Sequence, residues 1–189
     1  MNEATYEKIT ALQKEINEKH KQITALRKEL TDEQINDYVL KNGDGKPVLL
    51  SSLFNEKNEL LVIHNMGKKC VYCTLWADGF NGVLPHLTNR LPVVLVSPDE
   101  PQVQKEFAQS RGWGFNMLSA HGSTFIADLG FEPKPGMHWP GVSALVRRGD
   151  KIFRVSKDNF GPGDNYCSVW PLLDLLPNGA NGWQPKYEY

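Results

Sequence analysis

The sequence predicts an α/β fold in which a mixed central sheet is flanked by helices and preceded by an N-terminal helical extension. Two short apolar runs, ELLVIHNM (59–66) and LPVVLVSP (91–98), are rich in branched residues, which is typical of strands buried on both faces. A helical pattern follows each run, and a pair of strands later flanks the turn Gly149-Asp150. A long N-terminal stretch without Gly or Pro completes the pattern.

The N-terminal stretch Asn2–Leu30 is predicted to be a helix with one apolar stripe. Its apolar residues recur at spacings of three, four and seven, and Lys19 interrupts them. We expect this helix to dock on its own domain. A dimerising coiled coil, and hence a homodimer through this helix, is the alternative, although the stripe is short for one. The stripe consists of Ile9, Leu12, Ile16, Ile23, Leu26 and Leu30.

The remaining elements are expected in chain order. Short strands at 38–40 and 48–50 flank the Asn-Gly-Asp-Gly turn, before the central strand 59–66. A helix should run from about Cys70 toward Leu87, with a break between Gly79 and Gly82 as an option. Further expected elements are a strand at 91–98, a helix at 100–112, an extended piece and a short helix within 113–131, a hairpin at 141–157 and a helix at 165–176.

This order sets the expected topology and domain organisation. The strand–helix–strand unit requires a parallel pair, and the hairpin adds an antiparallel edge to the sheet. We divide the chain into an N-terminal helical extension (1–34), the main domain (35–177) and a tail (178–189). The tail is rich in turn residues and is either an ordered wrap or a loose end.

Composition and charge exclude several classes of function. The net charge of the 189 residues is −1, so no strong field for nucleic acid or an anionic membrane is expected. No apolar run approaches the roughly 20 residues that span a bilayer. The first residues, MNEATYEKIT, lack the apolar region of a secretion signal, and we expect a cytoplasmic protein. The three cysteines are too few for a disulfide framework, and Cys167 is expected to be a buried small residue.

The stretch KKCVYCTLW (68–76) places two cysteines three residues apart, just after a buried strand and at the start of a helix. This is the context of a thioredoxin-like redox site. The helix N-terminus favours a thiolate, and Lys68 and Lys69 would add to that effect. Cys70 is therefore the predicted nucleophile and Cys73 the resolving thiol, acting on protein or small-molecule disulfides.

Two other interpretations of the cysteines remain open. A zinc site needs further ligands at suitable spacings, and no two of the five histidines are close in sequence, so no metal or cofactor is expected. Alternatively, both cysteines are structural, in a non-catalytic binding or redox-sensing protein. His64, in the preceding strand, would influence the thiolate only if it faces the helix end, and Trp76 is expected in the core.

Several longer stretches resemble a bacterial thioredoxin-like family of unknown function, the domain-of-unknown-function family numbered 899. They are YVLKNGDGKPVLLSSLF, LLVIHNMGKKCVYCTLWADGFNGVLPHL, RGWGFNMLSAHGSTFIADLGF and PLLDLLP, of which CVYCTLWADGFNGVLPHL is the most specific. The resemblance covers nearly the whole chain. It implies a thioredoxin-like fold with an N-terminal helical extension, and it implies little about the substrate.

The chain departs from thioredoxin itself around the dithiol. Lys69 replaces the preceding tryptophan, and Val71-Tyr72 is the spacer. Ser143 is expected where thioredoxin has a cis-proline beside the dithiol, with Pro140 three residues earlier. Peroxiredoxins place Thr or Ser three residues before their reactive cysteine, where this chain has Gly67, so peroxidase activity is a minor option. The candidate lining residues are Lys68, Lys69, His64, Tyr72, Trp76 and Ser143.

Overall fold

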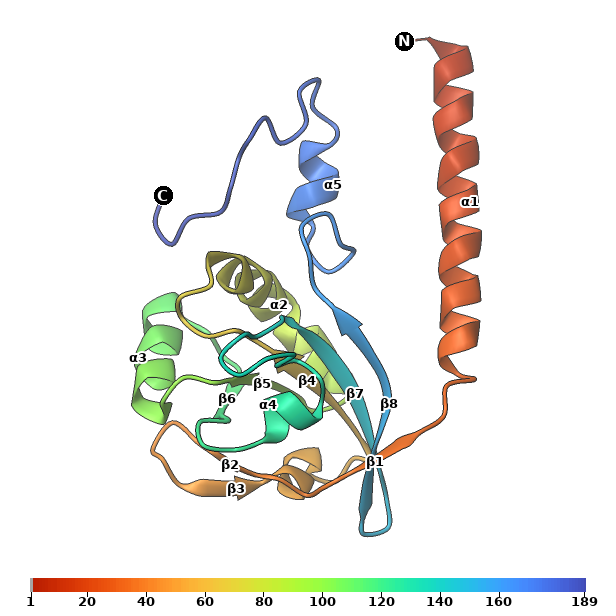
Figure 1. The fold of residues 1–189 in the computed structure, drawn as a ribbon. Helices are drawn as coiled ribbons and strands as arrows, with labels where there is room; N and C mark the ends of the chain where they lie inside the picture. Colours follow the sequence, from red (N-terminus) through yellow and green to blue (C-terminus); the bar gives the residue numbers. More distant parts are fainter. Residues whose placement is uncertain (1) are drawn as a thin grey trace.

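The structure is a computed structural model that describes residues 2–189; Met1, the first residue of the predicted extension, lies outside the described residues. Within this range one eight-stranded sheet runs in the order β1-β8-β7-β4-β5-β6-β2-β3 (Figure 1). The three strands β4, β5 and β6 are parallel to one another, and the other neighbours pair antiparallel. The predicted mixed sheet with flanking helices is confirmed.

The elements lie close to their expected positions. The helices are α1 (Glu3–Arg27), α2 (Val71–Arg90), α3 (Pro101–Arg111), α4 (Phe125–Asp128) and α5 (Val169–Leu173), with a 3₁₀ turn, η1, at Leu50–Phe54. The strands are β1 (Glu33–Ile35), β2 (Val39–Lys41), β3 (Pro47–Leu49), β4 (Glu59–His64), β5 (Val93–Ser97), β6 (Asn116–Ser119), β7 (Gly141–Arg148) and β8 (Lys151–Asn159). No helix within residues 2–189 has the length and apolar character to cross a membrane.

One strand was not expected, helix α5 is shorter than the expected 165–176, and the optional break in α2 is absent. Strand β1 lies at the edge of the sheet and pairs with β8. It was not predicted, because its three residues are too few to show the alternation of apolar and polar residues that marks a strand. Helix α2 continues through Gly79 and Gly82 without a break and even contains Pro85. Its buried residues, such as Trp76, Ala77 and Leu84, hold the helix on the sheet despite the weak helix formers.

The sheet separates two apolar layers. One face packs against α2, where Ile63 of β4 and Leu95 of β5 meet Trp76 and Ala77. The other face packs against α4 and η1, where Val62 of β4 meets Phe125. Successive side chains of a strand point to opposite faces. Alternate residues of β4 therefore face α2, the helix that begins at the cysteines, and the residues between them face the opposite layer.

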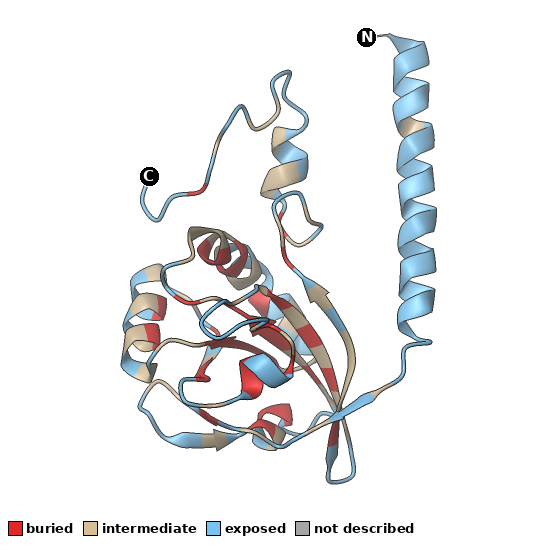
Figure 2. Ribbon diagram, in the orientation of Figure 1, coloured by how far each residue is buried: buried red, intermediate tan, exposed pale blue. Residues whose placement is uncertain are grey.

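The expectation that the N-terminal helix docks on its own domain is wrong. None of the residues of α1 is buried, and the helix stands beside the body of the protein with exposed surface along its length (Figures 1 and 2). Two contacts near its C-terminal half tie it to the domain, Arg27 to Asp158 and His20 to Asn165. Its apolar stripe stays in solvent, with exposed fractions of 46% at Ile9, 57% at Leu12, 53% at Ile16, 45% at Ile23 and 60% at Leu26.

Candidate dithiol site

Cys70 is the N-cap of α2, directly after the loop that leaves β4. Its backbone is extended, and its sulfur accepts the backbone N–H of Cys73 at 3.0 Å. An N-cap acceptor satisfies one of the free N–H groups that begin every helix. Cys70 is half-buried, whereas Cys73 is only 2% exposed. Of the two sulfurs, Cys70 is therefore the one that a substrate can approach.

Hydrogen bonding makes the Cys70 thiol more acidic and the Cys73 thiol less acidic. The hydrogen bond with the Cys73 side chain, helped by the backbone N–H groups of Cys73 and Tyr72, lowers the pKa of Cys70 from 9.0 to about 7, against the opposing effect of burial. The same side-chain hydrogen bond, together with burial, raises the pKa of Cys73. The proton therefore stays with Cys73 while Cys70 ionises. Cys70 is thus the more acidic thiol of the pair.

The loop between β4 and α2 is held by two side chains that the sequence prediction did not include. Asn65 accepts the Gly67 N–H at 2.8 Å and donates to the Cys73 carbonyl at 3.4 Å. Asp99, which follows β5, accepts the Lys68 N–H at 2.7 Å. Both residues follow neighbouring parallel strands at the same edge of the sheet, and that position is the sequence signal that could have pointed to them.

Gly67 adopts a backbone conformation that favours glycine, with φ of +97°. A β-carbon at this position would lie 2.6 Å from a carboxylate oxygen of Asp99. The approach of Asp99 to the loop backbone therefore depends on the missing side chain at Gly67.

Aromatic residues of α2 lie behind the dithiol. Tyr72, within the spacer, stacks on Trp170 of α5 with ring centroids 6.3 Å apart, and it contacts Trp76 at 6.2 Å. Trp76 is 3% exposed and donates its indole N–H to Asp164 at 3.3 Å. Trp76 is a core residue, as expected, and Tyr72 links the first turn of α2 to the C-terminal part of the chain.

Lys68 and Lys69 have exposed side chains. The influences that hold the Cys70 pKa low are hydrogen bonds within the first turn of α2, rather than the charges of these lysines. The two lysines are adjacent to the dithiol in sequence, but their side chains point into solvent.

His64 and Ser143 do not face the helix end. Ser143 pairs with Val62 inside β7, and its hydroxyl lies 2.9 Å from Nε2 of His64. The His64 ring stacks on Phe131 at 3.8 Å, in the layer opposite α2. Burial, then the charges of Arg154 and Lys157, lower the pKa of His64 to about 3, so its ring is neutral. Correcting the expectation, Ser143 lies within a strand and not in the loop beside the dithiol.

The third cysteine and the acidic groups give no sign of a metal centre. Within residues 2–189, no three His, Cys, Asp or Glu side chains come together as metal ligands would. Cys167 is 5% exposed and packs in the layer of α2, where burial raises its pKa. All three cysteines are free thiols in the structure.

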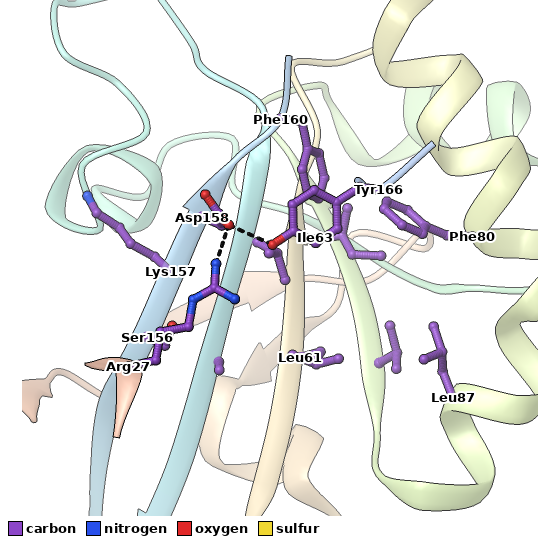
Figure 3. A pocket seen from close by; sticks show the side chains of 13 residues that line it. Arg27, Leu61, Ile63, Phe80, Leu87, Ser156, Lys157, Asp158, Phe160 and Tyr166 are labelled. Atoms are coloured by element: carbon purple, nitrogen blue, oxygen red, sulfur yellow. Dashed lines mark hydrogen bonds and ion pairs between the residues drawn. The ribbon is translucent and has the colours of Figure 1, made fainter. Parts of the chain in front are cut away.

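A hollow of about 300 Å³ lies between α2 and the sheet, away from the cysteines (Figure 3). Its walls are apolar, and they include Leu61, Ile63 and Phe80. At its mouth Asp158 accepts hydrogen bonds from Arg27 at the end of α1 and from the Tyr166 hydroxyl, the latter at 2.7 Å. Of the predicted lining residues, none contributes to this hollow.

The family model for bacterial proteins of unknown function called DUF899 matches residues 3–189. The chain belongs to the DUF899 family. None of the curated proteins matches it. The match includes α1 and the C-terminal tail as well as the sheet, so both appendages are part of what defines this DUF899 chain.

Solved structures show the fold of the DUF899 chain to be thioredoxin-like. Peroxiredoxin Q from Xanthomonas campestris superposes with a TM-score of 0.55 at 16% identity, over 65% of this chain and 80% of that one. A peroxiredoxin-like protein from Aquifex aeolicus gives 0.54 at 14% identity, over 68% and 74%. A hypothetical protein from Sinorhizobium meliloti 1021 gives 0.51 at 16% identity, over 84% and 88%. At such identities the likeness concerns the fold alone.

Proposed function

We propose that this protein is a thiol–disulfide oxidoreductase in which Cys70 is the nucleophile and Cys73 the resolving thiol. The proposal rests on the difference in accessibility and pKa between the two cysteines. Cys70 is the accessible N-cap sulfur with a lowered pKa of about 7, and Cys73 is buried with a raised pKa. A thiolate available near neutral pH next to a protonated partner is what disulfide exchange requires.

The exchange proceeds in two displacements. The Cys70 thiolate attacks one sulfur of the substrate disulfide, forms a mixed disulfide and releases the other half as a thiolate. Cys73 then loses its proton and attacks the Cys70 sulfur, which closes the Cys70–Cys73 disulfide and releases the second half of the substrate. The substrate gains two electrons, the dithiol loses two, and an external thiol reductant restores it.

Gly67 argues for disulfides over peroxides as substrates. A peroxide-orienting hydroxyl, three residues before the nucleophile, cannot be introduced there without displacing the Asp99 carboxylate, 2.6 Å from the β-carbon position. The positive φ of Gly67 adds backbone strain for any other residue. The peroxiredoxin-like fold is therefore combined with a loop that lacks this catalytic group.

The function is tested by measuring disulfide reduction, with dithiothreitol as the electron source and a small aromatic disulfide or insulin as substrate. We expect Cys70→Ser to abolish turnover and Cys73→Ser to accumulate a mixed disulfide at Cys70. Cys167→Ala, a buried cysteine outside the pair, is the control and should keep its activity. Turnover that persists in Cys70→Ser would exclude the assignment of the nucleophile.

The second candidate function is a binding or redox-sensing protein with structural cysteines. The nearly complete burial of Cys73 is the observation in its favour, since buried cysteines are commonly inert. A double variant, Cys70→Ser with Cys73→Ser, separates the two functions. Unchanged cellular behaviour of this variant would favour the binding function, and its loss would favour the redox function.

We also propose a cytoplasmic setting and a homodimer. Three free cysteines fit a reducing compartment. Helix α1 offers an apolar stripe with no buried residue, at the heptad spacing with which two helices pack together. The partner that such a stripe fits is the same helix of a second copy, because its spacing repeats identically in both.

A further inference from the structure

The C-terminal segment crosses the end of α2 that carries the dithiol. After α5 the chain turns back toward α2 and α3 (Figure 1). Near its end, Tyr187 meets Phe107 and Arg111 in the last turns of α3. Trp183 packs edge-on against Trp170 at 6.0 Å, and Trp170 in turn stacks on Tyr72 of the dithiol spacer. Pro185 is buried. The segment is thus anchored beside the spacer, on the side of α5.

A second anchor holds the segment on the side of α3. Arg111 donates to the backbone carbonyl of Tyr187 at 2.6 Å, and the Tyr187 ring lies edge-on to Phe107 with centroids 6.2 Å apart. Arg111 is itself fixed by an ion pair with Asp78 of α2. Tyr187 is 39% exposed. Tyr189 is 85% exposed, and its hydroxyl accepts the backbone N–H of Lys186 at 3.1 Å.

Both anchors lead to α2, through Tyr72 on one side and Asp78 on the other, so the segment between them crosses the helix that carries the dithiol. Burial raises the pKa of the Tyr187 phenol, and the charges of Cys70 and Cys73 act in the same direction. The half-buried state of Cys70 is consistent with a neighbouring chain segment across its approach.

We propose that Trp183–Tyr187 forms one wall of the substrate site and restricts Cys70 to low-molecular-weight disulfides; this rests on the oxidoreductase function proposed above. A disulfide within a folded protein brings extended backbone alongside the attacked bond, and the anchored segment occupies space next to the dithiol where such backbone would lie. A small disulfide needs only a path to one sulfur.

The test compares the alkylation of Cys70 by iodoacetamide and by a polyethylene-glycol maleimide, with the modified residue identified by mass spectrometry. The variants are a chain that ends at Gly182 and Tyr187→Ala; Glu188→Gln, at an exposed neighbouring position, is the matched control. In both variants we expect Cys70 to react with the bulky reagent at least about tenfold faster. This factor corresponds to about 1.4 kcal/mol, the free energy needed to move the segment away from Cys70. Iodoacetamide should react with little change, and the control should match the unaltered protein.

Two results would overturn the proposal. One is an unchanged rate with the bulky reagent in both variants. The other is an equal acceleration of both reagents, which would indicate loosening of the site and not removal of a wall. Alkylation requires no turnover, so the proposed function can fail in the disulfide assay while the ratio of the two rates still decides this inference. If the shortened chain does not fold, Tyr187→Ala decides alone.

Discussion

The sulfur of Cys70 accepts a backbone N–H at 3.0 Å from within its own helix turn. The more accessible of the two sulfurs is therefore also the one whose pKa is lowered. The pKa of the proposed nucleophile is thereby lowered by groups that cannot move independently of α2. Cys73 supplies both the backbone N–H and the side-chain hydrogen bond, so the proposed resolving residue also lowers the pKa of its partner.

The pH dependence of alkylation tests this local arrangement. Because the pKa of Cys70 is lowered from 9.0 to about 7, its thiolate fraction, and hence its rate with iodoacetamide, should rise with a midpoint near pH 7 and level off above it. The denatured chain serves as control and should show a midpoint near about 8.5. A folded midpoint as high as that of the denatured chain contradicts the account.

The buried pair His64 and Ser143 predicts an acid-sensitive stability without any effect on Cys70. The folded pKa of about 3 lies below the ordinary 6.5, so only the unfolded chain binds a proton between these values. The free energy of unfolding should therefore fall as pH decreases from 6.5 toward 3, by up to about 1.4 kcal/mol per unit.

The double variant His64→Phe with Ser143→Ala removes both hydrogen-bonding groups and should lose most of that pH dependence. Urea unfolding at several pH values measures it. The alkylation rate of Cys70 should be unchanged, since both side chains lie in the layer opposite α2. An altered Cys70 rate would show that the pair acts on the dithiol after all.

At the scale of elements, the loop between β4 and α2 sets the position of the dithiol. Parallel pairing of β4 with β5 brings Asn65 and Asp99 to one edge, and together these side chains accept the N–H groups of Gly67 and Lys68. The helix start is therefore fixed by a neighbouring strand as well as by its own cap.

Gly67→Ala tests this loop. The positive φ and the close approach of Asp99 should make the variant less stable by about 1–3 kcal/mol and should shift the alkylation midpoint of Cys70 upward, because the first turn of α2 is displaced. Gly79→Ala is the matched control. It lies in α2, where the added carbon has no atom within 4 Å beyond its chain neighbours and the nearby helix backbone, and the variant should be more stable by about 0.5–1 kcal/mol. Equal behaviour of the two variants in thermal unfolding and alkylation would refute the role of the loop.

At the scale of the whole molecule, the exposed stripe of α1 predicts the oligomeric state. We expect a dimer in solution, a monomer for Ile16→Glu, which places a charge in the stripe, and an unchanged dimer for Lys14→Glu, which lies off the stripe. Lys19→Leu should tighten the dimer because it completes the stripe. Sedimentation measures the mass of each. A monomeric full-length protein would exclude the proposed interface.

The order of elements was readable from the sequence because apolar runs, turn residues and helical spacing agree over most of the chain. The cysteines could be placed at a strand-to-helix junction for the same reason. Contacts between distant segments could not be read. Ser143 and His64 meet through strand register, and Tyr187 reaches Phe107 of α3 only because the tail folds back.

Helices α1 and α2 show the same limit: sequence patterns predict local structure but not the contacts between distant segments. The helical spacing of residues 2–30 correctly predicts a helix, but spacing alone does not say what covers the apolar stripe. The expected docking on the same chain failed because the contacts of α1 with the domain, Arg27 with Asp158 and His20 with Asn165, are polar and bury none of its apolar residues. The optional break between Gly79 and Gly82 is absent because α2 packs on the sheet.

The central claim is that Cys70 and Cys73 form a redox couple, and equilibration of the protein in thiol–disulfide buffers of graded potential tests it most directly. Mass spectrometry after acid quenching would measure the fraction of chains with a Cys70–Cys73 disulfide. The account predicts one two-electron transition with a defined midpoint, with Cys167 reduced throughout and the transition absent from Cys73→Ser. Failure of the two sulfurs to join at any potential, while the protein stays folded, would contradict it.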